Sequence, residues 1–420
     1  MDSMFGTDGI RGVYGKTVTP RLFYAVGKAL GGLKRKVKIV IGKDPRPSGE
    51  VLESAFLAGF FARGGVAGKL GIVPTPAVSY LTPFYGADFG VVIGASHNPS
   101  EYNGMKLFGA DGKKLSTAQE QEIQLRIQKE SRTQRVNHTG EVFRVSTTPY
   151  RAFLSKGSSL NGLKVVLDTA NGSTSDFAAR AFRSRGATVF TVNRKGKGKM
   201  INFRSGATYP ACISAFTVKK GADIGFAFDG DGDRVIVADR FGNIYDGDDL
   251  LYLFAREYHC DRVVGTVLTN AGVERALKER GTIVFRAPVG DKNVAAIMRE
   301  TVAPLGAEGA GHVLFSSHLT GDGVYTALRF AELMQIRGDS LFRRGEYRKF
   351  PCATKNIPLP LNLTKLKEAI QQQEHCQPLV RIVVRPSGTE PVLRLYAEGE
   401  NEKACKECLE RINAVILGGE

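Results

Sequence analysis

Short apolar runs alternate with amphipathic segments along most of the chain. Six runs have the length of a buried strand: VKIVIG (37–42), FGVVIGA (89–95), LKVVLDT (163–169), DIGFAFD (223–229), RVIVAD (234–239) and RVVGTVL (262–268). Between them, segments such as 50–63 and 173–185 have helical periodicity and polar starts. Buried strands that alternate with helices are typical of α/β domains with largely parallel sheets. We therefore predict that an α/β unit repeats along the chain.

The length of the chain and the breaks in this rhythm predict four domains. At 420 residues the chain exceeds a single domain of roughly 100–200 residues. The polar stretch 130–150 indicates a connection or an edge strand, and KNIPLPLNLT (355–364) contains prolines. The last segment has the pattern helix, strand, loop, strand, helix. The predicted domains are 1–150, 151–247, 248–355 and 356–420: three similar α/β domains with mainly parallel mixed sheets, and a smaller C-terminal α+β domain, around a central cleft.

Composition narrows the class of protein. The chain is 42% hydrophobic and 24% charged, which is ordinary for a globular protein. It has no run of about 18 apolar residues, and its N-terminus lacks the blocks of a signal peptide. Six scattered cysteines suit a reducing compartment better than a disulfide framework. Cys405 and Cys408 have no second pair at zinc spacing. We expect a cytoplasmic protein.

The formal charge of +16 raises the question of a polyanionic partner. The basic stretches 194–199 and 343–349 have little aromatic interleaving and belong to no nucleic-acid-binding motif. We therefore expect no nucleic-acid or membrane partner, and the basic surface equally suits small anionic substrates.

A serine-containing loop follows one of the apolar strands. The stretch GASHNPSEYNGMKLFGADGKKL begins at Gly94, so Ser96 lies at the carboxyl end of a strand, where α/β sheets bind ligands. A hydrolase nucleophile elbow requires G-x-S-x-G, whereas position 98 is Asn. Ser96 and Asn98 are also residue types that cap helices or form side-chain turns. These residues alone leave two roles for Ser96 open, contact with a ligand and local capping. If Ser96 contacts substrate, we expect it to be exposed.

The stretch FDGDGDR (228–234) brings three carboxylates together. Asp229, Asp231 and Asp233 alternate with two glycines, and carboxylates this close repel one another unless a cation joins them. Oxygen ligands suit Mg²⁺ or Ca²⁺. An EF-hand needs Gly and Glu where this chain has Arg234 and Arg240. The sequence indicates a metal site, with an exposed acidic turn as the alternative.

Three further motifs offer polar groups. VRPSGTEP combines a guanidinium, hydroxyls and glycine-freed amides, which suit a phosphate, although a hairpin turn explains the glycine as well. GAEGAGH (306–312) offers Glu308 and His312 for gripping hydroxyls. FGTDGIRG near the N-terminus offers Thr7, Asp8 and Arg11 for holding a loop or for chemistry.

Taken in order, FGTDGIRG, GASHNPSEYNGMK, FDGDGDR, GAEGAGH and RPSGTEP resemble the α-D-phosphohexomutase family, most closely its bacterial phosphoglucosamine mutase branch. The resemblance covers essentially the whole chain. It implies an isomerase that moves a phosphoryl group within its substrate through a phosphoserine and a sugar bisphosphate. It also implies one Mg²⁺ per chain, a sugar 1,6-bisphosphate activator, a sugar phosphate as the partner molecule, and a monomer or homodimer.

The resemblance implies three sets of site residues. The catalytic set is Ser96, Arg11, Lys106 and His97. The metal ligands are Asp229, Asp231, Asp233 and a phosphate oxygen on Ser96. The substrate-binding set is Arg234, Glu308, His312, Arg385, Ser387, Gly388 and Thr389. Lys106 can act as a base only if burial or nearby cations lower its pKa.

Departures from the family pattern bear on the sugar. The sugar loop usually reads G-E-x-S-G-H, whereas this chain has Gly309 and Ala310, so one hydroxyl ligand is missing. RAPVGDKNV (286–294) resembles the glucosamine branch's R-A-x-V-G-D-R-Y-V. The leading expectation is interconversion of glucosamine 6-phosphate and glucosamine 1-phosphate for amino-sugar and cell-wall precursor synthesis. The alternatives are a phosphoglucomutase or phosphomannomutase, or a weakened sugar-phosphate binding protein.

Overall fold

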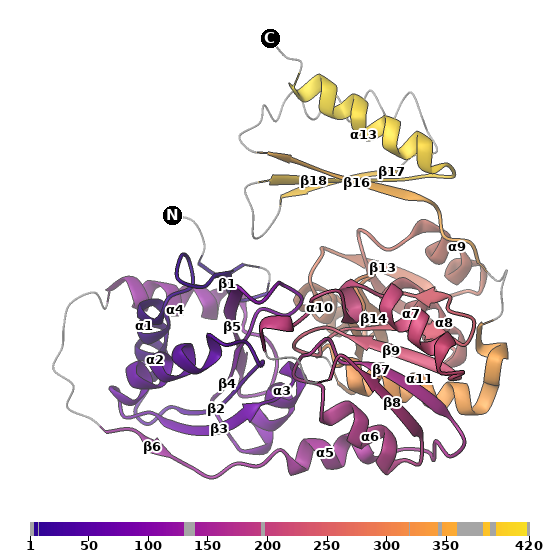
Figure 1. The fold of residues 1–420 in the computed structure, drawn as a ribbon. Helices are drawn as coiled ribbons and strands as arrows, with labels where there is room; N and C mark the ends of the chain where they lie inside the picture. Colours follow the sequence, from indigo (N-terminus) through magenta and orange to yellow (C-terminus); the bar gives the residue numbers. More distant parts are fainter. Residues whose placement is uncertain are drawn as a thin grey trace.

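The computed structural model describes residues 4–6, 8–129, 139–194, 198–318, 320–342, 347–358, 381–386 and 392–417. They form four sheets that follow one another along the chain (Figure 1). Three sheets carry helices and lie together, and the fourth stands apart above them with one helix on its outer side. The prediction of three α/β domains and a smaller C-terminal domain is confirmed. None of the described helices combines the length and apolar character needed to span a membrane.

The first sheet is mixed. Its strands are, in sheet order, β1 (Ile10–Val13), β5 (Tyr102–Gly109), β4 (Phe89–Ile93), β2 (Lys38–Lys43), β3 (Val66–Ile72) and β6 (Glu141–Val142). Its helices are α1 (Pro20–Gly31), α2 (Gly49–Phe61), α3 (Thr75–Phe84) and α4 (Thr117–Lys129). β1 and β5 run antiparallel to their neighbours, and the other four strands are parallel. The short β6 lies in the polar stretch for which a connection or an edge strand was predicted.

The second sheet places the acidic motif in a tight connection. Its strands are, in sheet order, β11 (Ile244–Tyr245), β10 (Val235–Asp239), β9 (Ile224–Phe228), β7 (Lys164–Asp168) and β8 (Thr188–Val192). Its helices are α5 (Thr148–Ser155), α6 (Phe177–Ser184), α7 (Ala211–Lys219) and the 3-10 turns η1 (Gly198–Met200) and η2 (Gly206–Thr208). β9 and β10 pair antiparallel, so residues 229–234 turn the chain back at the carboxyl end of β9.

The third sheet positions the sugar-loop motif in the same way. Its strands are, in sheet order, β13 (Ile283–Ala287), β12 (Arg262–Thr266), β14 (Leu305–Ala307) and β15 (Val313–Phe315). Its helices are α8 (Gly247–Glu257), α9 (Ala271–Glu279), α10 (Asp291–Thr301), α11 (Gly323–Arg337) and the 3-10 turn η3 (Gly338–Phe342). One apolar core runs from α3 through the second domain to the third, so these domains pack together.

The C-terminal domain is a three-stranded antiparallel sheet covered by one helix. Its elements are β16 (Cys352–Pro358), β17 (Arg381–Pro386), β18 (Val392–Glu398) and α13 (Glu402–Leu417), in the sheet order β16, β18, β17. β16 begins four residues before the predicted fourth segment, and the helix predicted ahead of β17 lies outside the described residues. Cys405 and Cys408 are on α13 and are buried in the core between this helix and the sheet. The exact domain boundaries stay predictions.

Candidate active site

The loop between β4 and β5 holds Ser96 in a backbone conformation that few non-glycine residues adopt. Its φ is +47°, in the left-handed region, which costs about 1–3 kcal/mol for a residue with a Cβ. Hydrogen bonds from two side chains hold the backbone in this conformation. The guanidinium of Arg46, which is fully buried, donates to the carbonyls of Ser96 (3.0 Å) and Asn98 (2.8 Å), and Asn202 donates to the same two carbonyls at 2.8 and 3.0 Å.

Ser96 is fully buried, which corrects the expectation that it is exposed. Its hydroxyl donates to Asp229 Oδ2 at 2.7 Å, across the interface between the first and second domains. The two loops approach so closely that a Cβ at Gly230 would lie 2.7 Å from the Ser96 carbonyl. The acidic loop of the second domain therefore covers the serine, a contact between segments more than a hundred residues apart.

The three carboxylates predicted to bind a metal are together and buried. One oxygen from each of Asp229, Asp231 and Asp233 lies within 4.8 Å of the others. Burial, with the charges of the other two, raises the pKa of Asp229 well above its usual value. Asp231 Oδ1 is buried and has no hydrogen-bond partner among the residues that the structure describes. A buried set of hard oxygen donors with an unused acceptor fits Mg²⁺.

Lys106 projects from β5 into the same acidic cluster. Its Nζ lies 2.9 Å from Asp231 Oδ2, 2.7 Å from Asp233 Oδ2 and 3.0 Å from Asp8 Oδ2. Burial alone would lower the pKa of Lys106, but these three carboxylates raise it well above its usual value. Arg11 pairs with Asp8 and donates to Asn98 Oδ1 at 3.1 Å. Lys106 and Arg11 therefore both lie among the carboxylates of the cluster, and the proton-transfer role expected for them stays a prediction.

His97 lies beside the serine as a neutral imidazole. Its Nδ1 is 3.4 Å from Ser96 Oγ. Burial, with the charges of Arg234 and Arg11, lowers the pKa of His97 to about 3. Near neutral pH it therefore carries no charge.

The sugar-loop residues contact the acidic cluster from the third domain. Glu308 Oε2 lies 2.8 Å from His312 Nδ1, and His312 Nε2 lies 3.1 Å from Asp233 Oδ1. Burial would lower the pKa of His312, but Asp233 and Glu308 raise it to about 10. His312 Nε2 is also 3.3 Å from Arg234 Nε, so His312 and Arg234 both lie against Asp233.

Of the proposed phosphate-binding residues, only Arg385 is described. It lies on β17 opposite Arg394 of β18. Burial and the charge of Arg394 lower the pKa of Arg385, and the charge of Glu308 partly offsets them. Adjacent positive charges suit a phosphate. Ser387, Gly388 and Thr389 lie outside the described residues, as does Thr7.

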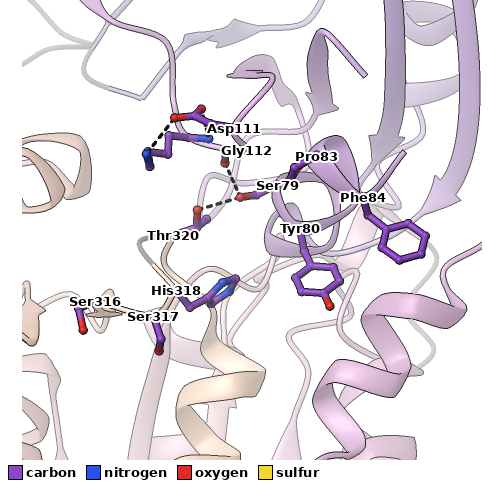
Figure 2. Close-up of a pocket in the computed structure, with 11 residues that line it drawn as sticks. Ser79, Tyr80, Pro83, Phe84, Asp111, Gly112, Ser316, Ser317, His318 and Thr320 are labelled. Carbon is purple, nitrogen blue, oxygen red and sulfur yellow. Dashed lines mark hydrogen bonds and ion pairs between the residues drawn. The ribbon is translucent and has the colours of Figure 1, made fainter. Parts of the chain in front are cut away.

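A cavity of about 410 Å³ lies beside this cluster, at the junction of the first and third domains (Figure 2). Its lining comes from α3, from the turn at 111–113 and from residues 316–318 and 320. Ser79 Oγ and Thr320 Oγ1 lie 2.8 Å apart at its edge. The next residue, Gly321, is so close to the cluster that a Cβ there would lie 2.8 Å from the Asp233 carbonyl. None of the predicted site residues lines this cavity, so it is separate from the reacting groups.

The motif analysis missed several residues that hold the site together. Asp44 orients Arg46 through a 2.9 Å contact between its Oδ2 and Arg46 Nε, and both follow the strand β2 directly. Charged residues at the carboxyl end of a buried strand were the available signal. Lys114 and Asp291 lie inside quoted motifs, GASHNPSEYNGMKLFGADGKKL and RAPVGDKNV, but their pairing could not be predicted because the partners are distant in sequence.

Comparison with known proteins gives a consistent result along the chain. Four family models match in order: Phosphoglucomutase/phosphomannomutase, alpha/beta/alpha domain I (residues 2–134), domain II (148–242), domain III (246–347) and C-terminal domain (353–415). The phosphoglucosamine mutase of Geobacillus thermodenitrificans is 38% identical over 445 residues, covering 99% of this chain and 98% of the relative. That of Clostridium beijerinckii is 39% identical over 451 residues, covering 99% of both chains.

Two solved structures are similar over nearly the whole chain. The crystal structure of a phosphoglucomutase/phosphomannomutase family protein from Burkholderia thailandensis has a TM-score of 0.83 and 26% sequence identity, covering 98% of this chain and 96% of that one. A phosphomannomutase-like protein from Thermus thermophilus has a TM-score of 0.76 and 20% identity, covering 99% of both chains, which concerns the fold alone.

Proposed function

This chain belongs to the phosphoglucomutase/phosphomannomutase family, and we propose that within it the chain interconverts glucosamine 6-phosphate and glucosamine 1-phosphate. It is an isomerase of the phosphohexomutase type. The observation that carries the proposal is the Ser96 hydroxyl held 2.7 Å from Asp229 inside a buried cluster of three carboxylates. Relatives that share 37–39% identity over their full length carry the phosphoglucosamine mutase name, which favours glucosamine over glucose or mannose.

In the proposed mechanism a phosphoryl group on Ser96 moves to the free hydroxyl of the sugar phosphate. The bond from phosphorus to Ser96 Oγ breaks, a bond to the sugar oxygen forms, and the product is a sugar bisphosphate. Asp229, Asp231, Asp233 and a phosphate oxygen would hold Mg²⁺, which when bound offsets negative charge on the transferring group. The departing Ser96 oxygen gains a proton and the sugar hydroxyl loses one, and we assign both transfers to Lys106, which gives a proton to Ser96 and recovers one from the sugar hydroxyl.

The second half of the reaction returns the other phosphate to Ser96. The bisphosphate must turn round while it is retained, so the enzyme needs one grip on the sugar and one on the phosphate that is not reacting. We assign the first to Glu308 and His312, and the second to Arg385 with residues 387–389. Arg234, next to Asp229 and Asp233, is assigned to the transferring phosphoryl group. Closure of the C-terminal domain would exclude water and so limit hydrolysis.

A coupled assay with the 6-phosphates of glucosamine, glucose and mannose tests the function. We expect turnover with Mg²⁺ and a trace of sugar 1,6-bisphosphate as activator, fastest with glucosamine phosphate, and none in excess chelator. Ser96→Ala should abolish turnover, and intact mass should show one phosphate on part of the wild type and none on the variant. Near-normal turnover by Ser96→Ala would exclude the mechanism, and a preference for another sugar would exclude the proposed substrate.

The cellular setting is part of the same proposal. The described cysteines are all free thiols, which suits the reducing cytoplasm. The sugar phosphate is the proposed partner molecule, and the chain is proposed to act as a monomer or homodimer without nucleic acid.

A further inference from the structure

The ammonium of Lys114 joins the first domain to the third. Lys114 lies between β5 and α4, and its Nζ is 2.6 Å from Oδ1 of Asp291, the first residue of α10. The same Nζ contacts Asp8 Oδ1. The side chains of Lys114 and Asp291 are 13% and 7% exposed. Burial would lower the pKa of Lys114, but Asp291 and Asp8 raise it. Removing one charged partner of a pair this buried costs stability, because the other charge is left buried without a partner.

Two chains of contacts lead from this pair into the active site. On one side, Lys106 lies between Asp8 and Asp233, at 3.0 and 2.7 Å. On the other side, the amide of Gly290, next to Asp291, donates to Glu308 Oε1 at 2.8 Å. Glu308 then contacts His312, whose Nε2 lies 3.1 Å from Asp233. The contacts close into an interdomain ring of eight residues: Asp233, Lys106, Asp8, Lys114, Asp291, Gly290, Glu308 and His312.

We propose that Lys114 and Asp291 are positioning residues that fix Glu308, assigned to the sugar, relative to Lys106 and the carboxylate cluster. The inference rests on the proposed function, which assigns those roles. The substrate must contact Glu308 of the third domain and Lys106 of the first domain at the same time. Transfer reactions depend steeply on such alignment, and a misplacement of about 1 Å can cost a hundredfold in rate. The pair also gives a role to the RAPVGDKNV segment, which contains both Gly290 and Asp291.

The local backbone supports this arrangement. Gly290 has a φ of +125°, a conformation that L side chains rarely adopt, and it is the N-cap of α10. Its amide donates to the Glu308 carboxylate, which therefore lies next to the N-terminus of α10. An ion pair at Asp291 holds this helix terminus in place, so a change at Lys114 is transmitted to Glu308 through one rigid element.

A second ion pair across the same interface provides a matched control. Lys292 of α10 lies 2.9 Å from Glu120 of α4, but neither belongs to the ring. We expect Lys114→Met and Asp291→Asn to lower kcat on the order of ten- to a hundredfold, with KM changed less than about threefold. The double variant should be no slower than the slower single variant, because both break the same ring. Lys114→Arg should recover most of kcat, and Lys292→Met should keep it.

Hydrogen exchange supplies a readout that needs no activity. Exchange at the Gly290 amide should become faster in Lys114→Met and stay as in the wild type in Lys292→Met. A wild type that interconverts no sugar phosphate would contradict the proposed function alone. Normal kcat with unchanged Gly290 exchange in Lys114→Met would overturn the positioning role. Equal losses in Lys114→Met and Lys292→Met would also overturn it, because the interface in general, and not the ring, would then govern the rate.

Discussion

At the scale of single residues, neighbours from other domains influence the pKa and the orientation of the reacting side chains. Lys106 belongs to the first domain, but two of the three carboxylates that hold its pKa high come from the second. Ser96 is likewise oriented by Asp229 and by Asn202 of the second domain. The chemistry of these side chains therefore depends on domain packing as much as on their own type.

Asp248 is the residue for which pH dependence is clearest. It is buried under the sugar loop, where Asn270 donates to its Oδ2 at 3.0 Å and its Oδ1 has no partner within the described part of the chain. Burial, with the charges of Asp246 and Asp249, raises the pKa of Asp248 to about 7, against the opposing effect of Lys349. The folded state therefore binds this proton more tightly than the unfolded state, so the contribution to stability present below about pH 4 is lost as pH rises through 7.

We therefore expect Asp248→Asn to stabilise the protein more at pH 8 than at pH 5. The gain in stability at pH 8 should exceed that at pH 5 by on the order of 1–3 kcal/mol, since each pKa unit corresponds to about 1.4 kcal/mol. Urea unfolding at the two pH values measures it, with Asp261→Asn, an exposed carboxyl of the same domain, as the control. The same change in unfolding free energy at both pH values would show that ionisation of the buried Asp248 carboxyl does not destabilise the fold.

At the scale of elements, the contact between α1 and α2 fixes the outer layer of the first domain. A Cβ at Gly27 would lie 2.1 Å from the Phe56 carbonyl, and one at Gly59 would lie 2.0 Å from the Tyr24 carbonyl. The helices can approach this closely only because both positions lack side chains. Their core is the one on the sheet face away from the second and third domains.

Gly59→Ala should accordingly separate the helices and destabilise the protein by about 1–3 kcal/mol, the usual cost of overpacking. Gly49→Ala in the same helix is the control, because its Cβ would meet neighbours at 3.5 Å, an ordinary contact. Thermal or urea unfolding gives the difference in stability between the two variants. An unchanged stability in Gly59→Ala would mean that the helices can shift freely.

The element pattern could be predicted well from the sequence. All six apolar runs contain strand segments, 50–63 covers α2 from its second residue, and 173–185 contains α6. The reason is that a strand buried on both faces must be continuously apolar, which is visible in the chain itself. β16 was missed because its exposed and buried residues alternate, and because its end lies in the proline-containing segment at which a domain boundary was predicted.

At the scale of the whole molecule, one group of contacts attaches the C-terminal domain to the third. Arg381 of β17 donates to the carbonyls of Val267 and Thr269, at 2.9 and 3.0 Å, and pairs with Glu398. Glu398 in turn accepts from the amide of Ala271 at the start of α9, beside which the domain stands in Figure 1. These contacts of Arg381 and Glu398 with the third domain set the position of Arg385 relative to the sugar loop.

Arg381→Met should therefore raise KM for the sugar phosphate several-fold. Arg385, which we assign to the phosphate that is not reacting, would no longer be held in place. Small-angle scattering should show a larger radius of gyration. Lys355→Met is the control, since Lys355 pairs with Glu410 inside the C-terminal domain alone. If KM and dimensions both match the wild type, Arg381 does not hold the domain.

The sequence by itself determined the repeated α/β pattern and the acidic triad. Both are local: strand burial follows from continuous apolar runs, and the spacing of Asp229, Asp231 and Asp233 brings their carboxylates together in one short turn. The resemblance supplied the phosphoserine and the sugar and phosphate loops.

Only the tertiary structure decided the burial of Ser96, the carboxylates around Lys106 and the interdomain ring. Ser96 and Asp229 are separated by 133 residues, and Lys114 and Asp291 by 177. A pKa or a buried ion pair depends on distance in space and on the exclusion of water. Neither quantity is written in the order of residues along a chain, so both appear only once the domains have packed.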